Sequence, residues 1–175
     1  MIIHNEVIDN ILSRRSIRSY TDQQISQDEL DTILEAGKYA PSGMNQQTAR
    51  TVVVQSKERM QELVDLTMRL NKMEINPFYN APTVILVFGN TAGLTYTYDG
   101  ALAIENMFLA ANSLNIGTCW IYAVTPTFAT DEGKAWLKKI GVPDSYAIIG
   151  SIAVGYTADP IPDPKLREGQ FSTII

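Results

Sequence analysis

Two largely apolar stretches, residues 81–89 and 147–155, constrain the fold of this chain more than any other feature. Both are far shorter than the roughly 20 apolar residues that a membrane-spanning helix needs, so we expect no membrane partner. Apolar runs of this length are typical of buried β-strands. The length of 175 residues and the 45% share of apolar residues fit one folded domain with a sizeable core.

The rest of the chain alternates between helix and strand patterns. Apolar residues recur at helical spacing in segments 5–15, 26–39, 57–70, 98–114 and 131–139. Strands are expected at 50–55, 83–88, 118–123 and 147–156. Ser26 and Glu29 predict a capping box at the start of the second helix. The helix at 98–114 is apolar on more than one face, as at a subunit interface. These patterns predict one α+β domain over residues 1–175.

The last segment, residues 160–175, is expected to form an extended C-terminal arm. It contains Pro160, Pro162 and Pro164, which exclude a helix, and it ends in the strand-like residues 171–175. An arm of this kind is not easily buried alone. It is expected to add to a sheet, and the sheet of a neighbouring copy is one option.

Composition excludes several kinds of catalytic site. The chain has one histidine, His4, and one cysteine, Cys119, which are too few for a zinc site, and no Cys–His or Ser-His-Asp arrangement is expected. The P-loop and the G-x-G-x-x-G fingerprint are absent. The net charge of −5 argues against a nucleic-acid partner. If the chain is an enzyme, its reactive group therefore comes from a bound cofactor.

Two features indicate a cytoplasmic protein. A single cysteine cannot form an internal disulfide, which suits a reducing compartment. The first ten residues contain acidic side chains and no apolar run, so we expect no signal peptide.

The densest group of hydrogen-bond donors is formed by Arg14, Arg15, Ser16 and Arg18. Arginine offers forked, permanently charged donors and serine a short hydroxyl, and together they are suited to bind a phosphate. Cations at the end of a helix also complement its dipole, and the cluster alone favours neither interpretation.

A second pair of cations, Lys165 and Arg167, lies in the proline-rich arm. No helix or core requires them there, and they are able to close over the same phosphate. Taken alone, however, the pair fits a solvated charged tail better.

The loop after the second helix contains Pro41, Ser42, Gly43 and Asn45. Glycine lets the backbone approach a ligand closely, and the serine and amide side chains suit the polar edge of a flat heterocycle. A plain helix-to-strand connection explains the proline and the glycine equally well.

Trp120, Ile121 and Tyr122 follow Cys119 in the third expected strand. A buried strand explains Cys119 and Ile121, whereas Trp120 and Tyr122 share the other face. Aromatic residues on one face either belong to the core or form the wall of a site for an aromatic ligand. For each residue taken singly, the core is the better interpretation.

Four motifs occur in a characteristic order: R-R-S-x-R, then A-P-S-G-x-N, then an apolar helix running into G-T-C-W, and finally P-K-x-R. Together they resemble the nitroreductase family of FMN-dependent oxidoreductases over about residues 7 to 170. The resemblance implies an α+β fold, an α-β-α sandwich with a central mixed β-sheet flanked by helices. It also implies an intertwined homodimer with FMN at the subunit interface.

The resemblance also implies roles for the residues above. Arg14, Arg15 and Ser16 would contact the FMN phosphate and ribityl chain, joined by Lys165 and Arg167. Arg18 would reach the N1/C2-carbonyl edge of the ring. The partner subunit would supply Pro41, Ser42, Gly43 and Asn45, and Trp120, Ile121 and Tyr122 would lie along the ring.

The implied activity is transfer of reducing equivalents from NADH or NADPH, through flavin N5, to an acceptor such as a nitroaromatic or a quinone. No side chain is needed as a nucleophile, and Arg18 would give electrostatic support. A flavin-binding carrier or sensor without turnover is one alternative, and a nucleotide-binding module unrelated to flavin is another. The sequence departs from the family pattern in two places, and it therefore does not identify a substrate. Residues 71–80 match the family poorly, and Asn71 and Asn76 are the candidate ring contacts there. The chain also lacks the insertion that often shapes a substrate lid.

Overall fold

A four-stranded antiparallel sheet forms the centre of the protein in the computed structural model, which describes residues 3–165, 167–168 and 172–173. The strands are β1 (Ala49–Val54), β2 (Thr83–Asn90), β3 (Gly117–Ile121) and β4 (Tyr146–Gly155), in the order β1-β2-β4-β3. β2 and β4 are therefore internal. β2 is buried along residues 83–89, as its apolar sequence predicts.

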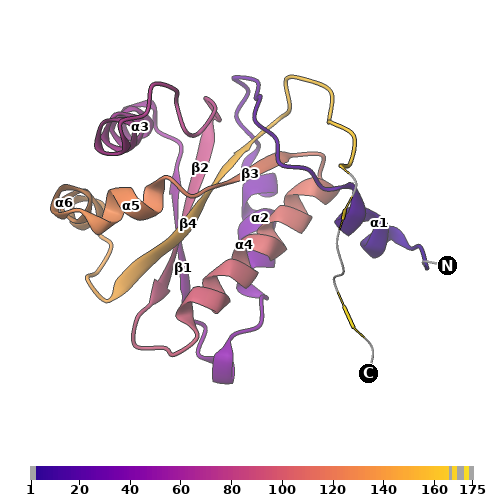
Figure 1. The fold of residues 1–175 in the computed structure, drawn as a ribbon, viewed down its shortest axis with the longest axis horizontal. Helices are drawn as coiled ribbons and strands as arrows, with labels where there is room; N and C mark the ends of the chain where they lie inside the picture. The colour runs from indigo at the N-terminus through magenta and orange to yellow at the C-terminus, as the bar shows by residue number, and fades with distance from the viewer. Residues whose placement is uncertain (1–2, 166, 169–171, 174–175) are drawn as a thin grey trace.

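Helices cover both faces of this sheet (Figure 1). On one face lie α2 (Gln27–Lys38) and α4 (Tyr96–Ser113), which enclose a core that includes Ile33, Ile85 and Met107. On the other face lie α3 (Lys57–Asn71), α5 (Val124–Ala129) and α6 (Asp131–Lys139), with a second core. The short helix α1 (Glu6–Ser13) packs outside the sandwich, against α4. The predicted α+β fold, with helices on both faces of a sheet, is confirmed.

The sheet departs from the expectation in the direction of its strands. The sequence predicts a mixed sheet, whereas every strand pair among the described residues is antiparallel. β2 and β3 run in the same direction, as in a strand–helix–strand unit, but β4 lies between them and pairs antiparallel with both. The one parallel pairing that the described residues form is an isolated bridge between Ser16 and Thr118.

Local sequence signals account for most element boundaries. The Ser26 side chain accepts a hydrogen bond from the Glu29 amide, and the Glu29 carboxylate accepts one from the Ser26 amide, so the predicted capping box is present at the start of α2. Asn5 caps α1 through its contact with the Ile8 amide. α5 was not predicted, because its six residues include a proline and carry no helical repeat of their own.

The C-terminal arm is described only in part. Residues 156–158 run beside residues 19–21, held by hydrogen bonds from the Thr21 amide to Tyr156 and from the Ala158 amide to Ser19. Residues 172 and 173 have no regular secondary structure, and the rest of the strand expected at 171–175 lies outside the described residues. No helix among the described ones combines the length and the apolar character that crossing a membrane requires.

Candidate functional site

Two groups of predicted site residues, the arginine cluster and the 41–47 loop, lie at opposite ends of α4 (Figure 1). At its C-terminal end, Nδ2 of Asn112 donates a hydrogen bond to Oγ of Ser13, at 3.0 Å, directly before the arginine cluster. At its N-terminal end, the Gly43 amide donates to Oδ1 of Asp99, at 3.1 Å. Asp99 and Asn112, which make these two contacts, are 13 residues apart in α4, which corresponds to about 20 Å along the helix axis. A single subunit therefore keeps the arginine cluster and the 41–47 loop apart.

The arginine cluster is anchored along the outer edge of β3. The Ile17 amide donates to the Thr118 carbonyl at 2.9 Å, next to the bridge between Ser16 and Thr118. The Tyr20 hydroxyl donates to the Ile17 carbonyl at 2.7 Å. These bonds fix the backbone from which the arginine side chains extend.

Arg14 and Arg15 each bury a donor that has no partner. The Arg14 guanidinium lies over the Phe108 ring, 5.1 Å from its centroid, and its Nη1 is buried without a hydrogen bond. Nη1 of Arg15 donates to the carbonyls of Leu12 and Arg14, but its Nε is buried and unbonded. Buried donors of this kind are normally satisfied, so an anion that accepts from them fits this place.

The positive charge of the cluster is not neutralised by nearby groups. None of the ion pairs formed by the described residues includes Arg14, Arg15 or Arg18. Burial raises the pKa of the Cys119 thiol, although the charges of Arg18 and Arg14 oppose this effect. The thiol is therefore protonated at neutral pH and does not offset the arginines.

Arg18 is held more loosely than Arg14. It is exposed, and its guanidinium lies over the Tyr79 ring at 5.9 Å from the centroid. Its Nη1 donates to the Ser16 carbonyl at the long distance of 3.3 Å. Most of its donors thus remain available to a ligand.

The 41–47 loop contains a short 3₁₀ turn, Gly43–Asn45, with an unusual backbone. Met44 and Asn45 have positive φ values of 51° and 54°, in the left-handed region that side chains other than glycine seldom adopt. The Ser42 hydroxyl accepts from the Gln47 amide at 3.0 Å and closes the loop. A Cβ at residue 43 would collide with the Thr95 hydroxyl, which explains the glycine. Pro41 and Asn45 are exposed.

The residues at the end of β3 have different surroundings. Trp120 is half-buried and packs flat on Gly150, where a Cβ would lie 2.7 Å from the indole. Ile121 is 5% exposed, and its side chain belongs to the core beneath α5. Tyr122 is 68% exposed. Of the three, Tyr122 has the side chain most accessible to a ligand.

The cations of the arm are exposed and are not brought to the arginines by any described contact. Lys165 and Arg167 both lie on the surface. Among the described residues of the arm, Ile161 lies near the cluster, because it lines a hollow of about 240 Å³ together with Arg15 and with Thr157, which precedes the arm.

The candidate amides in residues 71–80 have internal partners. Nδ2 of Asn71 donates to the Thr127 hydroxyl at 2.7 Å and to the Ala123 carbonyl at 3.2 Å, and it thereby fastens the chain after β3 to α3. Asn76 caps a turn, accepting from the Phe78 amide and donating to Asn80. Asn71 therefore holds residue 123, directly after Tyr122, and α5 against α3.

Sequence reasoning missed two residues of these groups, Tyr79 and Asp99. Tyr79 lies under Arg18, but nothing in its local sequence points to that contact. Asp99 did leave a signal, since it is a carboxylate near the start of a mostly apolar helix.

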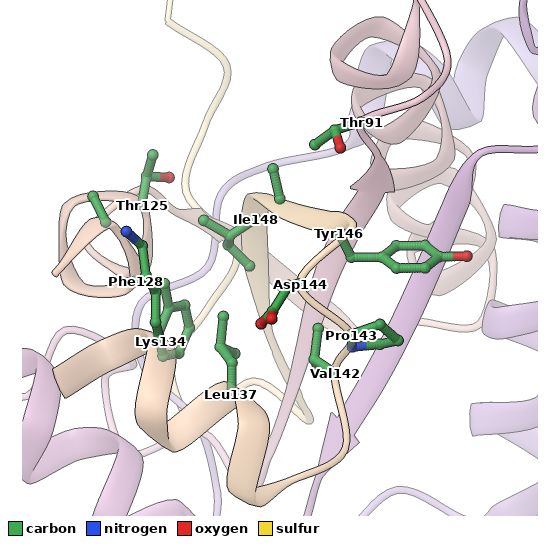
Figure 2. A pocket seen from close by; sticks show the side chains of 12 residues that line it. Thr91, Thr125, Phe128, Lys134, Leu137, Val142, Pro143, Asp144, Tyr146 and Ile148 are labelled. Atoms are coloured by element: carbon green, nitrogen blue, oxygen red, sulfur yellow. The ribbon is translucent and has the colours of Figure 1, made fainter. Parts of the chain in front are cut away.

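A hollow outside these groups has a volume of about 530 Å³ and lies between α5, α6 and the start of β4 (Figure 2). Phe128, Leu137 and Ile148 form its apolar wall, and Lys134 and Asp144 are its charged residues. It contains none of the predicted site residues. No cluster of three or more His, Cys, Asp or Glu side chains suited to a metal ion occurs within the described part of the chain.

Comparison with known proteins gives consistent matches. The model of a family described as the nitroreductase family matches residues 11–84 and 76–156. A protein of Archaeoglobus fulgidus, named as a candidate NADH dehydrogenase/NAD(P)H nitroreductase, is 31% identical over 88% of this chain and 87% of its own length. An FMN reductase [NAD(P)H] of Bacillus subtilis is 28% identical over 89% of this chain and 67% of its own length.

Solved structures agree with these sequence matches. A nitroreductase with bound FMN from Bacteroides fragilis superposes with a TM-score of 0.90 at 35% identity, covering 98% of this chain and 100% of that chain. A second nitroreductase with bound FMN, from Desulfitobacterium hafniense, gives a TM-score of 0.88 at 29% identity, over 99% of this chain and 100% of that chain.

Proposed function

Because the chain belongs to the nitroreductase family, we propose that it is an FMN-dependent oxidoreductase. It passes reducing equivalents from NADH or NADPH to an oxidised acceptor such as a nitroaromatic or a quinone. FMN, when bound, supplies the redox chemistry, which explains why a chain with one histidine and one cysteine needs no nucleophile of its own. The observation that carries the proposal is the pair of buried, unbonded donors on Arg14 and Arg15.

The arginine cluster would hold the phosphate end of the cofactor. Arg14 and Arg15 would donate to the phosphate, and Ser16 would add a short hydroxyl for the phosphate or the ribityl chain. Lys165 and Arg167 would close over the phosphate from the arm.

Arg18 would stabilise negative charge at the N1/C2-carbonyl edge of the ring. It is suited to this role because it is exposed and none of the described ion pairs occupies it. Trp120, Ile121 and Tyr122 would lie along the ring, and the carbonyl of the next residue, Ala123, accepts a hydrogen bond from Asn71.

The second part of the site would come from a second copy of the chain. The loop that carries Pro41, Ser42, Gly43 and Asn45 is joined to Asp99 near the N-terminal end of α4, whereas Arg14 lies against Phe108 in the C-terminal half of the same helix. A two-fold dimer in which the α4 helices run antiparallel brings the loop of one copy to the arginines of the other. We therefore propose a homodimer with FMN at its interface.

Uncovered apolar side chains support this dimer. α1 buries none of its residues, and Val7, Ile11 and Leu12 remain exposed. Leu102 and Tyr98 of α4 are exposed as well. Apolar surface that spans two packed helices is typical of a subunit interface. β1 is an edge strand of the sheet, and the arm of the partner is proposed to pair with it.

The proposal also covers organisation and location. Residues 1–175 would form one FMN-binding domain, with 160–175 as the arm that reaches the partner. A cytoplasmic location is supported by Cys119, a free and buried thiol.

A visible spectrum tests the proposal. The purified protein should show the absorption of bound flavin, and NADH or NADPH added without oxygen should bleach it. A following addition of a quinone or a nitro compound should restore the colour. Bleaching without catalytic turnover would favour a flavin-binding carrier or sensor, and a colourless protein that does not take up added FMN would refute the proposal.

A further inference from the structure

Asp99 is a buried carboxylate in the first turns of α4, and the function proposed above gives it no role. It is 3% exposed, and both of its oxygens are hydrogen-bonded. Oδ2 accepts from the Thr48 hydroxyl at 2.7 Å, and Oδ1 accepts from the Gly43 amide at 3.1 Å. Both donors belong to the loop segment between α2 and β1, so the carboxylate joins that segment to α4.

The charge on Asp99 suits this junction. Burial on its own would raise the pKa of Asp99, but the hydrogen bonds from Thr48 and Gly43 outweigh burial and lower it. The side chain is therefore ionised at neutral pH, and its two oxygens act only as acceptors. Its place near the N-terminus of α4 adds favourable interaction with the helix dipole.

The loop needs a fixed attachment, because its backbone conformation is not a relaxed one. Met44, Asn45 and Gln47 all have positive φ values, of 51°, 54° and 48°. Conformations of this kind persist only where the surrounding structure holds them. Asp99 contacts the loop at Gly43, directly before these residues, and at Thr48, directly after them.

We propose that Asp99 is the positioning residue that sets Ser42, Gly43 and Asn45 on the end of α4, in the place from which they reach the FMN bound to the partner subunit. This inference rests on the proposed function. Asp99 acts through the loop backbone and not by touching the cofactor. Its effect is therefore expected on cofactor affinity across the interface, whereas Arg14 acts on the cofactor within its own subunit.

FMN affinity of single variants is the first test. We expect Asp99→Ala to weaken FMN binding, followed by quenching of flavin fluorescence, by about tenfold or more, since two hydrogen bonds to a charged acceptor are lost. Asp99→Asn and Thr48→Val keep the shape of the side chain and lose fewer of these hydrogen bonds, so smaller decreases in FMN affinity are expected. Asp65→Asn, the same exchange at an exposed site on α3, is the matched control. Unchanged affinity in folded, dimeric Asp99→Ala and Asp99→Asn proteins would overturn the proposal.

A mixed dimer tests whether the effect crosses the interface. A different affinity tag on each variant allows isolation of dimers with one Asp99→Ala chain and one Arg14→Ala chain. If each site takes Arg14 from one copy and the loop from the other, one of the two sites contains neither change. Such dimers should bind half the FMN of the wild type, at wild-type affinity, whereas both parent homodimers bind weakly.

The outcomes separate this inference from the proposed function. Absence of an undamaged site in the mixed dimer would overturn the role of Asp99 across the interface, while FMN binding by the wild type would leave the proposed function standing. A wild-type protein that binds no FMN would overturn both.

Discussion

The arginines of the cluster are held in two different ways, and this difference separates their roles. Arg14 is packed against Phe108 with a buried, unbonded donor, whereas Arg18 is exposed over Tyr79. A fixed guanidinium is suited to bind the phosphate. An exposed guanidinium is suited to stabilise negative charge that develops on the flavin ring. The two positions therefore predict separable defects.

Replacing Arg18 should affect reduction more than binding. We expect Arg18→Ala to slow flavin reduction by NADH or NADPH about tenfold or more, because a charge that stabilises the reduced ring is lost. The fold should be retained, since Arg18 is exposed and makes one long hydrogen bond. Stopped-flow absorbance measures the rate, and Arg18→Lys should recover part of it. An unaltered reduction rate in folded Arg18→Ala protein would exclude the role.

Replacing Arg14 or Arg167 should affect retention of the cofactor instead. Each variant loses a charged donor to the phosphate, which predicts about tenfold weaker FMN binding for Arg14→Ala. Arg167→Ala is expected to lose less, because the arm is exposed. FMN content after dialysis measures both effects. Full occupancy in both variants would contradict the phosphate assignment.

The sequence indicates candidate residues where the signal is local. Arg14 and Ser16 are candidates because four polar residues lie in one short segment. Tyr79 could not be recognised, because its contact with Arg18 depends on packing of segments far apart in the chain. Asp99 is an intermediate case: its unusual place in an apolar helix is visible in the sequence, but its partners Gly43 and Thr48 are not.

At the scale of elements, the start of α2 depends on a few polar atoms. Ser26 caps the helix and exchanges hydrogen bonds with Glu29, whose Oε2 also accepts from the Tyr156 hydroxyl at 2.7 Å. Ser26→Ala should lower the free energy of unfolding by about 1 kcal/mol, because a helix amide loses its acceptor. Urea denaturation measures the loss. Ser145→Ala, at an exposed loop serine, should leave stability unchanged.

The helices α3 and α6 are joined by a carboxylate whose contribution depends on pH. Glu62 accepts hydrogen bonds from Arg59, Lys139 and Trp136. The bonds from Lys139 and Arg59, the larger effects, lower the pKa of Glu62 to about 2. The depressed value means that Glu62 stabilises the fold at pH above about 4.3, its value in the unfolded chain. This contribution is lost as the pH falls toward 2.

Substitution of Glu62 tests the assignment. Glu62→Gln should be less stable than the wild type near pH 7, and the difference should shrink as the pH is lowered from about 5 to 2. Thermal denaturation over this range measures it, with Glu58→Gln, exposed on the same helix, as the control. A difference that is independent of pH would show that charge on Glu62 is not its cause.

Elements differ in how far the sequence predicts them, and the reason is physical. The start of α2 is predicted closely because the two residues of its capping box, Ser26 and Glu29, are only three positions apart in the sequence. α5 depends on distant support: the Thr127 hydroxyl, inside it, receives a hydrogen bond from Asn71 of α3. The insertion of β4 between β2 and β3, which makes the sheet antiparallel, follows from long-range pairing that no local pattern encodes.

At the scale of the whole molecule, the proposed FMN site depends on the proposed dimer, because both subunits contribute residues to it. The arginine cluster and the 41–47 loop lie toward opposite ends of α4, so a subunit alone would offer FMN only part of the proposed contacts. Cofactor binding and association should therefore be coupled: FMN should stabilise the dimer, and loss of the dimer should release FMN.

Leu102→Glu tests this coupling. Leu102 is 43% exposed on α4, so the change is tolerated within a subunit but would place a charge in the apolar interface. We expect a shift to monomer in light scattering, together with loss of bound FMN, although residue 102 belongs to neither group of site residues. Lys57→Glu, which introduces the same side chain at the first residue of α3 in the opposite layer, should alter neither property. A Leu102→Glu monomer that keeps FMN at wild-type affinity would mean that one subunit completes the site by itself.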